Sequence, residues 1–157
     1  MLANKILVLV DFSECSLAAL RAAAALGERC GASLHILQVV TPATYAMADP
    51  TATSQMASSM AFEEALRNGR AELDALADST RQAFDVRSVT TEVTAGAPIP
   101  TIVERTRRGD FDLVALGTHG RSGLARLLMG SVAEQVLRNI DVPALVVPGG
   151  ESTDDEQ

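Results

Sequence analysis

The sequence predicts an α/β fold, a three-layer α/β/α sandwich built on a five-stranded parallel sheet with the strand order 3-2-1-4-5. Strand-like apolar runs alternate with helical patterns along the chain, an order typical of parallel strands joined by right-handed crossovers. The first run is apolar throughout, which is typical of a strand covered on both faces. The third run alternates between apolar and polar residues, which is typical of an edge strand with one face in water.

Two strands and the helix between them are predicted in the first part of the chain. Lys5 to Val10 is a nearly unbroken run of β-branched residues and leucine, so it is the first strand. An alanine-rich helix follows Asp11 and Ser13, and it stops at Gly31 because glycine is the usual residue after a helix C-terminus. Leu34 to Val40 is the second strand.

The middle of the chain is expected to hold a long loop and a long helix. Thr41 to Ser59 is rich in Ala, Thr, Ser and Met and contains two prolines, a composition that indicates a loop. Apolar residues then recur at helical spacing from Met60 to Phe84, although the pair Asn68-Gly69 falls in the middle of this helix. Val86 to Thr94 is the third strand.

The last part of the chain repeats the alternation twice. Pro98 to Arg108 is a short helix, and Leu113 to Leu116 is the fourth strand. Ser131 to Asn139 is a helix, and Ala144 to Val147 is the last strand. In the order 3-2-1-4-5 this last strand is an exposed apolar edge, so we expect a second copy to cover it in a homodimer.

Composition excludes several classes of function. Hydrophobic residues make up 47% of the chain and charged residues 21%, and no apolar run approaches the roughly 20 residues that a membrane span needs. We therefore expect no membrane insertion. A net charge of −7 and an aromatic content of 3% also argue against a nucleic acid partner, because such proteins usually carry a basic face and stacking platforms.

Length and termini predict one domain in the cytoplasm. Residues 1–150 are expected to form a single nucleotide-binding domain, and residues 151–157 an acidic, disordered tail. Met1 leads straight into a strand-like run rather than into a signal peptide, which predicts a cytoplasmic protein. Cys15 and Cys30 have no metal-ligand spacing and are expected to be free thiols.

The predicted strand order brings two polar segments together. The sheet reverses its winding between strands one and four, and ligands of such folds bind beyond the carboxyl ends of the strands at that point. Asp11 follows strand one and Gly117 follows strand four. We therefore expect a binding site where these two residues meet.

The segment from Gly117 to Ser131 has the features of a phosphate site. Its glycines let backbone amides approach a phosphate, and the unpaired amides at the start of the following helix attract an anion. Arg121 adds positive charge to an otherwise acidic chain. We also expect Gly130 to need a backbone conformation that valine disfavours. The expected contacts are Gly117, Gly120, Arg121, Gly130, Ser131 and Val132.

A purely structural interpretation remains open for the same residues. Ser131-x-x-Glu134 has the pattern of a capping box, so Ser131 could serve only to cap its helix. The glycines could serve only to form a turn, and Asp11 could only cap the first helix. His35 lies between apolar neighbours in strand two, and we interpret it as a tolerated outward residue rather than a ligand.

Together these blocks resemble the universal stress protein family. The resemblance rests on the spacing Gly117-x2-Gly120-x9-Gly130-Ser131, on Val132 to Leu137 after it, on the terminal Val142 to Val147 and on the opening block Ile6 to Ser16. It covers nearly the whole chain apart from residues 41–59 and the tail. The spaced glycines place it in the ATP-binding branch of the family.

That resemblance implies a ligand and a role for each matching residue. Asp11 and Ser13 would face the adenosine, and Val39 or Val40 would contact the adenine. The glycines, Ser131 and Val132 would hold the ribose and phosphates, and a divalent ion such as Mg²⁺ or Mn²⁺ would bind through the phosphate oxygens. The family also implies homodimers, a role in stress tolerance and regulation of a partner protein.

Two activities are consistent with such a site. The first is an ATP-binding regulatory module without rapid chemistry. The alternative is a slow ATPase or an autophosphorylating protein, for which Thr118, Ser122 and Ser131 are conceivable phosphate acceptors. A receiver domain is disfavoured, because Ala95-Gly96 and Pro148-Gly149 stand where that fold needs an aspartate and a lysine.

Overall fold

A computed structural model describes residues 3–42, 52–118 and 130–148 of the chain, with side chains from residue 57 onward in the second range. The strands in these ranges are β1 (Lys5–Leu9), β2 (Ser33–Val40), β3 (Ser88–Ala95), β4 (Leu113–Gly117) and β5 (Ala144–Val147). The helices are α1 (Glu14–Cys30), α3 (Ala52–Ala83), α4 (Pro98–Arg107) and α5 (Ser131–Asn139).

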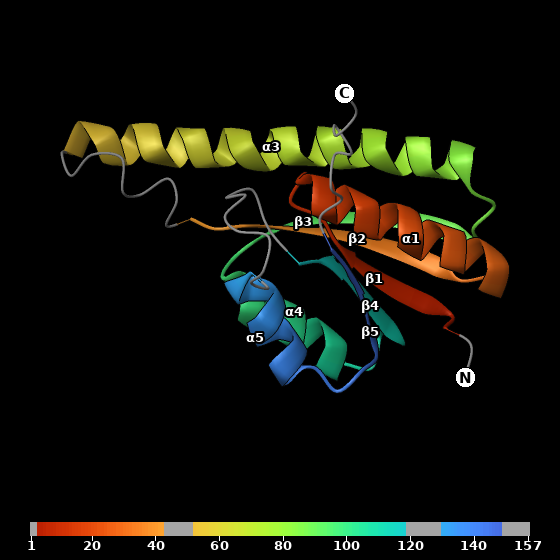
Figure 1. Cartoon of the computed structure of the whole chain (residues 1–157). Coiled ribbons are helices and arrows are strands. Elements are labelled where there is room, and N and C mark those ends of the chain that lie inside the picture. The colour runs from red at the N-terminus through yellow and green to blue at the C-terminus, as the bar shows by residue number, and fades with distance from the viewer. Residues whose placement is uncertain (1–2, 43–51, 119–129, 149–157) are drawn as a thin grey trace, which may run out of the picture.

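The five strands form one parallel sheet in the order β3-β2-β1-β4-β5. Helices α1 and α3 cover one face of the sheet, and α4 and α5 cover the other (Figure 1). The predicted fold class and strand order are therefore confirmed. The sheet reverses its winding between β1 and β4, as expected, and the carboxyl ends of these two strands lie next to each other.

The central strand explains why its sequence is apolar throughout. Ile6 and Val8 pack into the core beneath α1 and α3, and Leu7 packs into the core beneath α4 and α5. All three side chains are fully buried, because successive residues of a strand point to opposite faces. At the edge, Val89 of β3 is buried while the neighbouring Thr90 is exposed, which confirms the predicted edge strand with one wet face.

Residues 52–59 are helical, so the prediction of a loop over Thr41 to Ser59 was wrong for this part. Helix α3 is 32 residues long, or about 48 Å at 1.5 Å per residue, and its first half extends past the strands (Figure 1). Alanine and methionine are strong helix formers, and Pro50 lies just before the helix begins. The small polar residues that suggested a loop are compatible with an exposed helix.

The same helix continues without a break through Asn68 and Gly69. Gly69 is buried against the sheet, and a Cβ atom at this position would lie only 2.6 Å from Oε1 of Gln38 on β2 and 3.6 Å from Cγ1 of Val93 on β3. The glycine therefore lets the helix approach the sheet closely. None of the helices in the described ranges is long and apolar enough to cross a membrane, and Cys15 and Cys30 are free thiols, as predicted.

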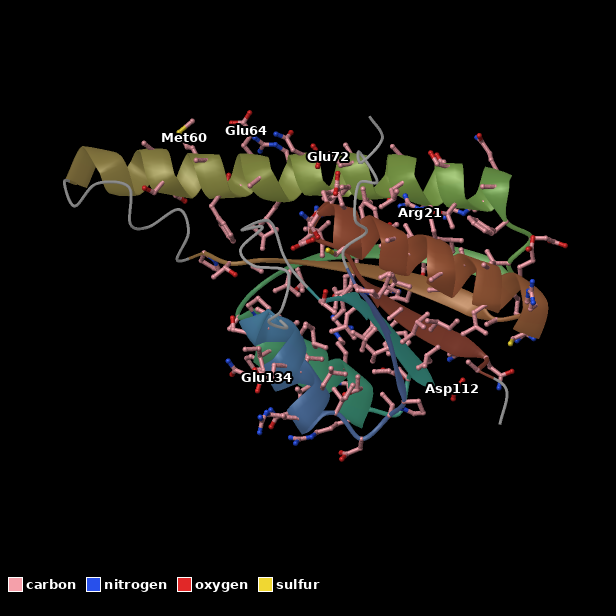
Figure 2. The ribbon with its side chains drawn as sticks, viewed as in Figure 1. Arg21, Met60, Glu64, Glu72, Asp112 and Glu134 are labelled. Atoms are coloured by element: carbon pink, nitrogen blue, oxygen red, sulfur yellow. The ribbon has the colours of Figure 1, made fainter. Side chains whose placement is uncertain are left out.

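The packing of α3 can be tested by truncating its one fully buried leucine. Leu73 is 0% exposed, so Leu73→Ala leaves a cavity beneath α3 and should lower the free energy of unfolding by about 3 kcal/mol. Glu72→Ala is the control, because Glu72 points away from the sheet (Figure 2) and should change stability by less than about 0.5 kcal/mol. Urea unfolding measures both variants, and equal losses would contradict this packing.

Candidate functional site

The turn from β1 into α1 is held by hydrogen bonds between its own side chains and backbone. Ser13 is the N-cap of α1, and its hydroxyl oxygen accepts a hydrogen bond from the Ser16 amide. Oδ1 of Asp11 accepts hydrogen bonds from the amide of Ser13 at 3.0 Å and from its hydroxyl at 2.5 Å. Asp11 therefore supports the cap, and its carboxylate has a defined orientation at the carboxyl edge of the sheet.

Two further residues complete this turn. Ser16 is 4% exposed; its hydroxyl donates to the carbonyl of Ser13 at 2.9 Å and accepts from the amide of Asp11 at 3.3 Å. Phe12 has a φ of 63°, the left-handed region that a bulky residue rarely adopts. Its ring packs against the core beneath α1 and α3. The turn is thus a bent backbone fixed from both sides.

The end of β4 lies directly against the first turn of α1. A Cβ atom at Gly117 would be 2.6 Å from Cβ of Cys15 and 2.7 Å and 2.9 Å from its backbone carbon and oxygen. Since real Cβ atoms do not approach so closely, position 117 has room only for glycine. This contact brings the two polar segments together, as the strand order predicted.

The chain leaves β4 at Thr118 and returns at Gly130. The amide of Gly130 donates to the carbonyl of Thr118 at 2.6 Å, and the amide of Thr118 donates to the carbonyl of Val147 on β5 at 3.0 Å. These bonds fix the start of α5 beside the end of β4. Its first amides have no partner within the helix, which makes this end a favourable position for an anion.

Two expectations about the start of α5 were wrong. The N-cap is Gly130, and no side chain caps the helix, so Ser131 is the first helical residue and the capping box does not form. The backbone of Gly130 has φ −56° and ψ 145°, a region open to any L-residue. The local reason for a glycine is therefore space near the helix start rather than an unusual backbone conformation.

A cavity of about 250 Å³ opens between these segments. One end of it is apolar, and the other end is polar and contains the start of α5. The apolar end is lined by Leu9, Val10, Leu37, Val39, Pro98, Ile102 and Leu116. The polar end is lined by Asp11, Ser16, Gly117, Thr118, Gly130, Ser131, Val132 and Ala133. Asp11 carries the only charge among the described lining residues.

The cavity unites most of the residues that the sequence singled out. Those lining it are Asp11, Val39, Gly117, Gly130, Ser131 and Val132. Ser13 lies behind Asp11 as the helix cap. Val40 is buried and alternates to the other side of β2 from Val39, with its carbonyl accepting from the amide of Gly96. Gly120 and Arg121 lie outside the described residues.

Sequence reasoning missed one wall of the cavity. Pro98 and Ile102 of α4 face Leu37 and Val39 of β2 across its apolar end. The alternation along β2 could have identified Leu37, because it shares a face with Val39. Nothing in the pattern of α4 distinguishes a residue that lines a cavity from one that only packs against the sheet. Ser16 was missed because a serine in the first turn of a helix is common.

Comparison with known proteins identifies relatives along nearly the whole chain. Residues 3–148 match the model of the universal stress protein family. Universal stress protein MJ0531 of Methanocaldococcus jannaschii is 31% identical to this chain over 144 residues, which are 92% of this chain and 81% of that protein.

Solved structures of such proteins have the same fold. The chain superposes on universal stress protein UspA from Lactobacillus plantarum with a TM-score of 0.80 and 23% identity, over 92% of this chain and 97% of that one. It superposes on a universal stress protein in complex with cAMP with a TM-score of 0.62 and 22% identity, over 96% of this chain and all of that one (100%).

The contact between Gly117 and α1 generates a stability prediction. Gly117→Ala places a Cβ atom against the backbone of Cys15, so the start of α1 must move, and the free energy of unfolding should fall by about 2 kcal/mol. Urea unfolding measures the change. The loss should persist when Cys15→Ala is added, because the backbone atoms remain; recovery in the double variant would mean that only the thiol is in the way.

Proposed function

Because this chain belongs to the universal stress protein family, we propose that it is a nucleotide-dependent regulatory module that binds ATP at the carboxyl edge of its sheet. One observation carries the proposal. A single cavity joins an apolar space between β2 and α4 to the unpaired amides at the start of α5. A base needs the first environment, and a phosphate needs the second.

The adenosine is assigned to the inner part of the cavity. Adenine would lie between Val39 and Ile102, whose side chains supply apolar surface on both sides. The carboxylate of Asp11, oriented by Ser13, would accept hydrogen bonds from the ribose hydroxyls. The cavity, at about 250 Å³, is small for a drug-sized ligand, so it suits a nucleoside whose phosphates continue outside it along α5.

The phosphates are assigned to the start of α5. The amides of Ser131 and Val132 would donate to phosphate oxygens, helped by the positive end of the helix dipole. Gly120 and Arg121 remain predicted contacts, and a divalent ion such as Mg²⁺ or Mn²⁺ would bind through the phosphates. A solved relative with the same fold is in complex with cAMP, also a purine nucleotide with a phosphate, which supports a nucleotide as the class of ligand here.

The outer edge of β5 suggests a homodimer. All four residues of β5 are only half-buried, although their side chains are apolar. Leu145 packs toward α1 and Val146 toward the core beneath α5, whereas in the described part of the chain no strand pairs with the outer edge. We propose that a second copy covers this edge, because an exposed apolar edge strand otherwise promotes aggregation.

The phosphate assignment predicts that Gly130→Val weakens ATP binding by at least about tenfold, equal to about 1.4 kcal/mol. The backbone at Gly130 tolerates valine, so the loss comes from the side chain occupying the space of the phosphate. Ser131→Ala should weaken binding by less than about tenfold, because it removes one hydroxyl and leaves the amide. Titration calorimetry on variants checked by circular dichroism decides. If folded Gly130→Val binds ATP as tightly as the wild type, the phosphate site is elsewhere.

The dimer assignment predicts that Val146→Lys shifts the protein toward monomer, because a charge would have to be buried beside the shared edge. Light scattering at micromolar concentration measures the mass, and circular dichroism confirms that the variant remains folded. A wild-type protein that is monomeric under these conditions would rule out the β5 interface.

A further inference from the structure

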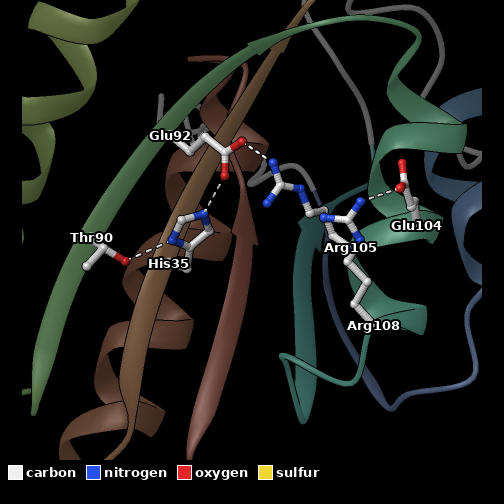
Figure 3. A network of polar contacts seen from close by, with 6 residues as sticks. All are labelled: His35, Thr90, Glu92, Glu104, Arg105 and Arg108. Atoms are coloured by element: carbon white, nitrogen blue, oxygen red, sulfur yellow. Dashed lines mark hydrogen bonds and ion pairs between the residues drawn. The ribbon is translucent and has the colours of Figure 1, made fainter.

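A polar network holds α4, the outer wall of the cavity, to the sheet. Glu92 of β3 forms ion pairs through one carboxylate oxygen with Arg105 of α4 and through the other with Nε2 of His35, at 3.1 Å. Nδ1 of His35 lies 2.8 Å from Oγ1 of Thr90 (Figure 3). Its ring also packs against Phe111, with 5.5 Å between the centroids. His35 is thus half-buried and bound, not a tolerated outward residue.

This network differs from the other ion pairs in the described part of the chain. Those pairs, such as Glu104 with Arg108, join residues three or four apart in sequence and are 47–73% exposed. The side chains of His35, Glu92 and Arg105 are 23–31% exposed and come from three different elements. Because water screens them less, these contacts constrain the relative positions of those elements more than a surface pair does.

The position of Glu92 connects the network to the cavity. Glu92 lies beside Leu37 in the register of β2 and β3, and Leu37 lines the apolar end. Arg105 follows Ile102 by three residues, so the two share one side of α4. The ion pair therefore joins the helix that carries one wall residue to a strand residue adjacent to the facing one.

Apolar packing alone holds this wall less firmly than it holds α1. The surface of β3 that faces α4 consists of Thr90, Glu92 and Thr94, because Val89, Thr91 and Val93 alternate to the other face. Only Ile102, Val103 and Thr106 of α4 are buried. Without Glu92, nothing on β3 would attract α4 toward that edge of the sheet.

We infer that Glu92 is a positioning residue of the nucleotide site: oriented by His35 and joined to Arg105, it sets the separation between Ile102 and the facing side chains of β2. The inference rests on the proposed nucleotide function. Loss of the carboxylate lets α4 move away, which enlarges the apolar end of the cavity and removes contacts with the base. The phosphate end, built by α5 and Gly117, is unaffected.

The test compares two glutamates changed in the same way. Glu92→Gln removes the link between sheet and helix, whereas Glu104→Gln removes a pair within α4 itself and is the matched control. By calorimetry, Glu92→Gln should weaken ATP and adenosine equally, by about 3- to 30-fold, and Glu104→Gln should weaken neither. Adding Arg105→Gln to Glu92→Gln should cause little further loss, because both act through one contact.

A ligand-free measurement separates this inference from the proposed function. In a methyl spectrum of the protein labelled at isoleucine, Glu92→Gln should shift the Ile102 signal and Glu104→Gln should leave it in place. If the wild type binds neither ATP nor adenosine, the proposed function fails and the methyl signal alone decides the role of Glu92. An unshifted signal, unchanged adenosine affinity, or loss of ATP binding without loss of adenosine binding would each overturn the inference.

Discussion

The close contact between Gly117 and the first turn of α1 is the constraint on which the site depends. A parallel sheet that reverses its winding between β1 and β4 places the ends of these strands side by side, but adjacency alone leaves room for side chains between them. At position 117 that room is absent, since a Cβ atom would fall within 3 Å of the Cys15 backbone. Asp11 and the start of α5 therefore line one cavity rather than two separate surfaces.

The two sides of that cavity are stabilised by different interactions. On the α1 side, seven residues of the helix are buried, and close packing resists displacement at every contact. On the α4 side, three residues are buried, and Glu92 supplies a link that packing does not. A wall held by a few directed contacts responds to the loss of one of them more than a densely packed wall does. The base and the phosphate of a ligand would thus depend on separate parts of the fold.

Sequence patterns predicted the fold and half of the site for an identifiable reason. Strand order follows from which runs are apolar on both faces, and the residues that end β1 and β4 follow from strand order, so Asp11 and Gly117 could be brought together without coordinates. Ile102 and Glu92 could not, because their roles depend on how far α4 lies from β2. The loop prediction failed at residues 52–59 because small polar residues occur both in loops and on exposed helices. Ser131 failed as a cap because the capping pattern fits two registers one residue apart.

The strained residue Phe12 has a physical explanation in the same geometry. A left-handed conformation costs an ordinary residue roughly 1–2 kcal/mol, yet glycine does not stand at this position. The phenyl ring packs against the core beneath α1 and α3, and burying such a ring contributes about 1.5–3 kcal/mol, which offsets the strain. The bend at Phe12 also lets Oδ1 of Asp11 reach both donors of Ser13. Glycine would relieve the strain but lose the ring that fixes the turn, so the orientation of Asp11 at the cavity depends on core packing behind it.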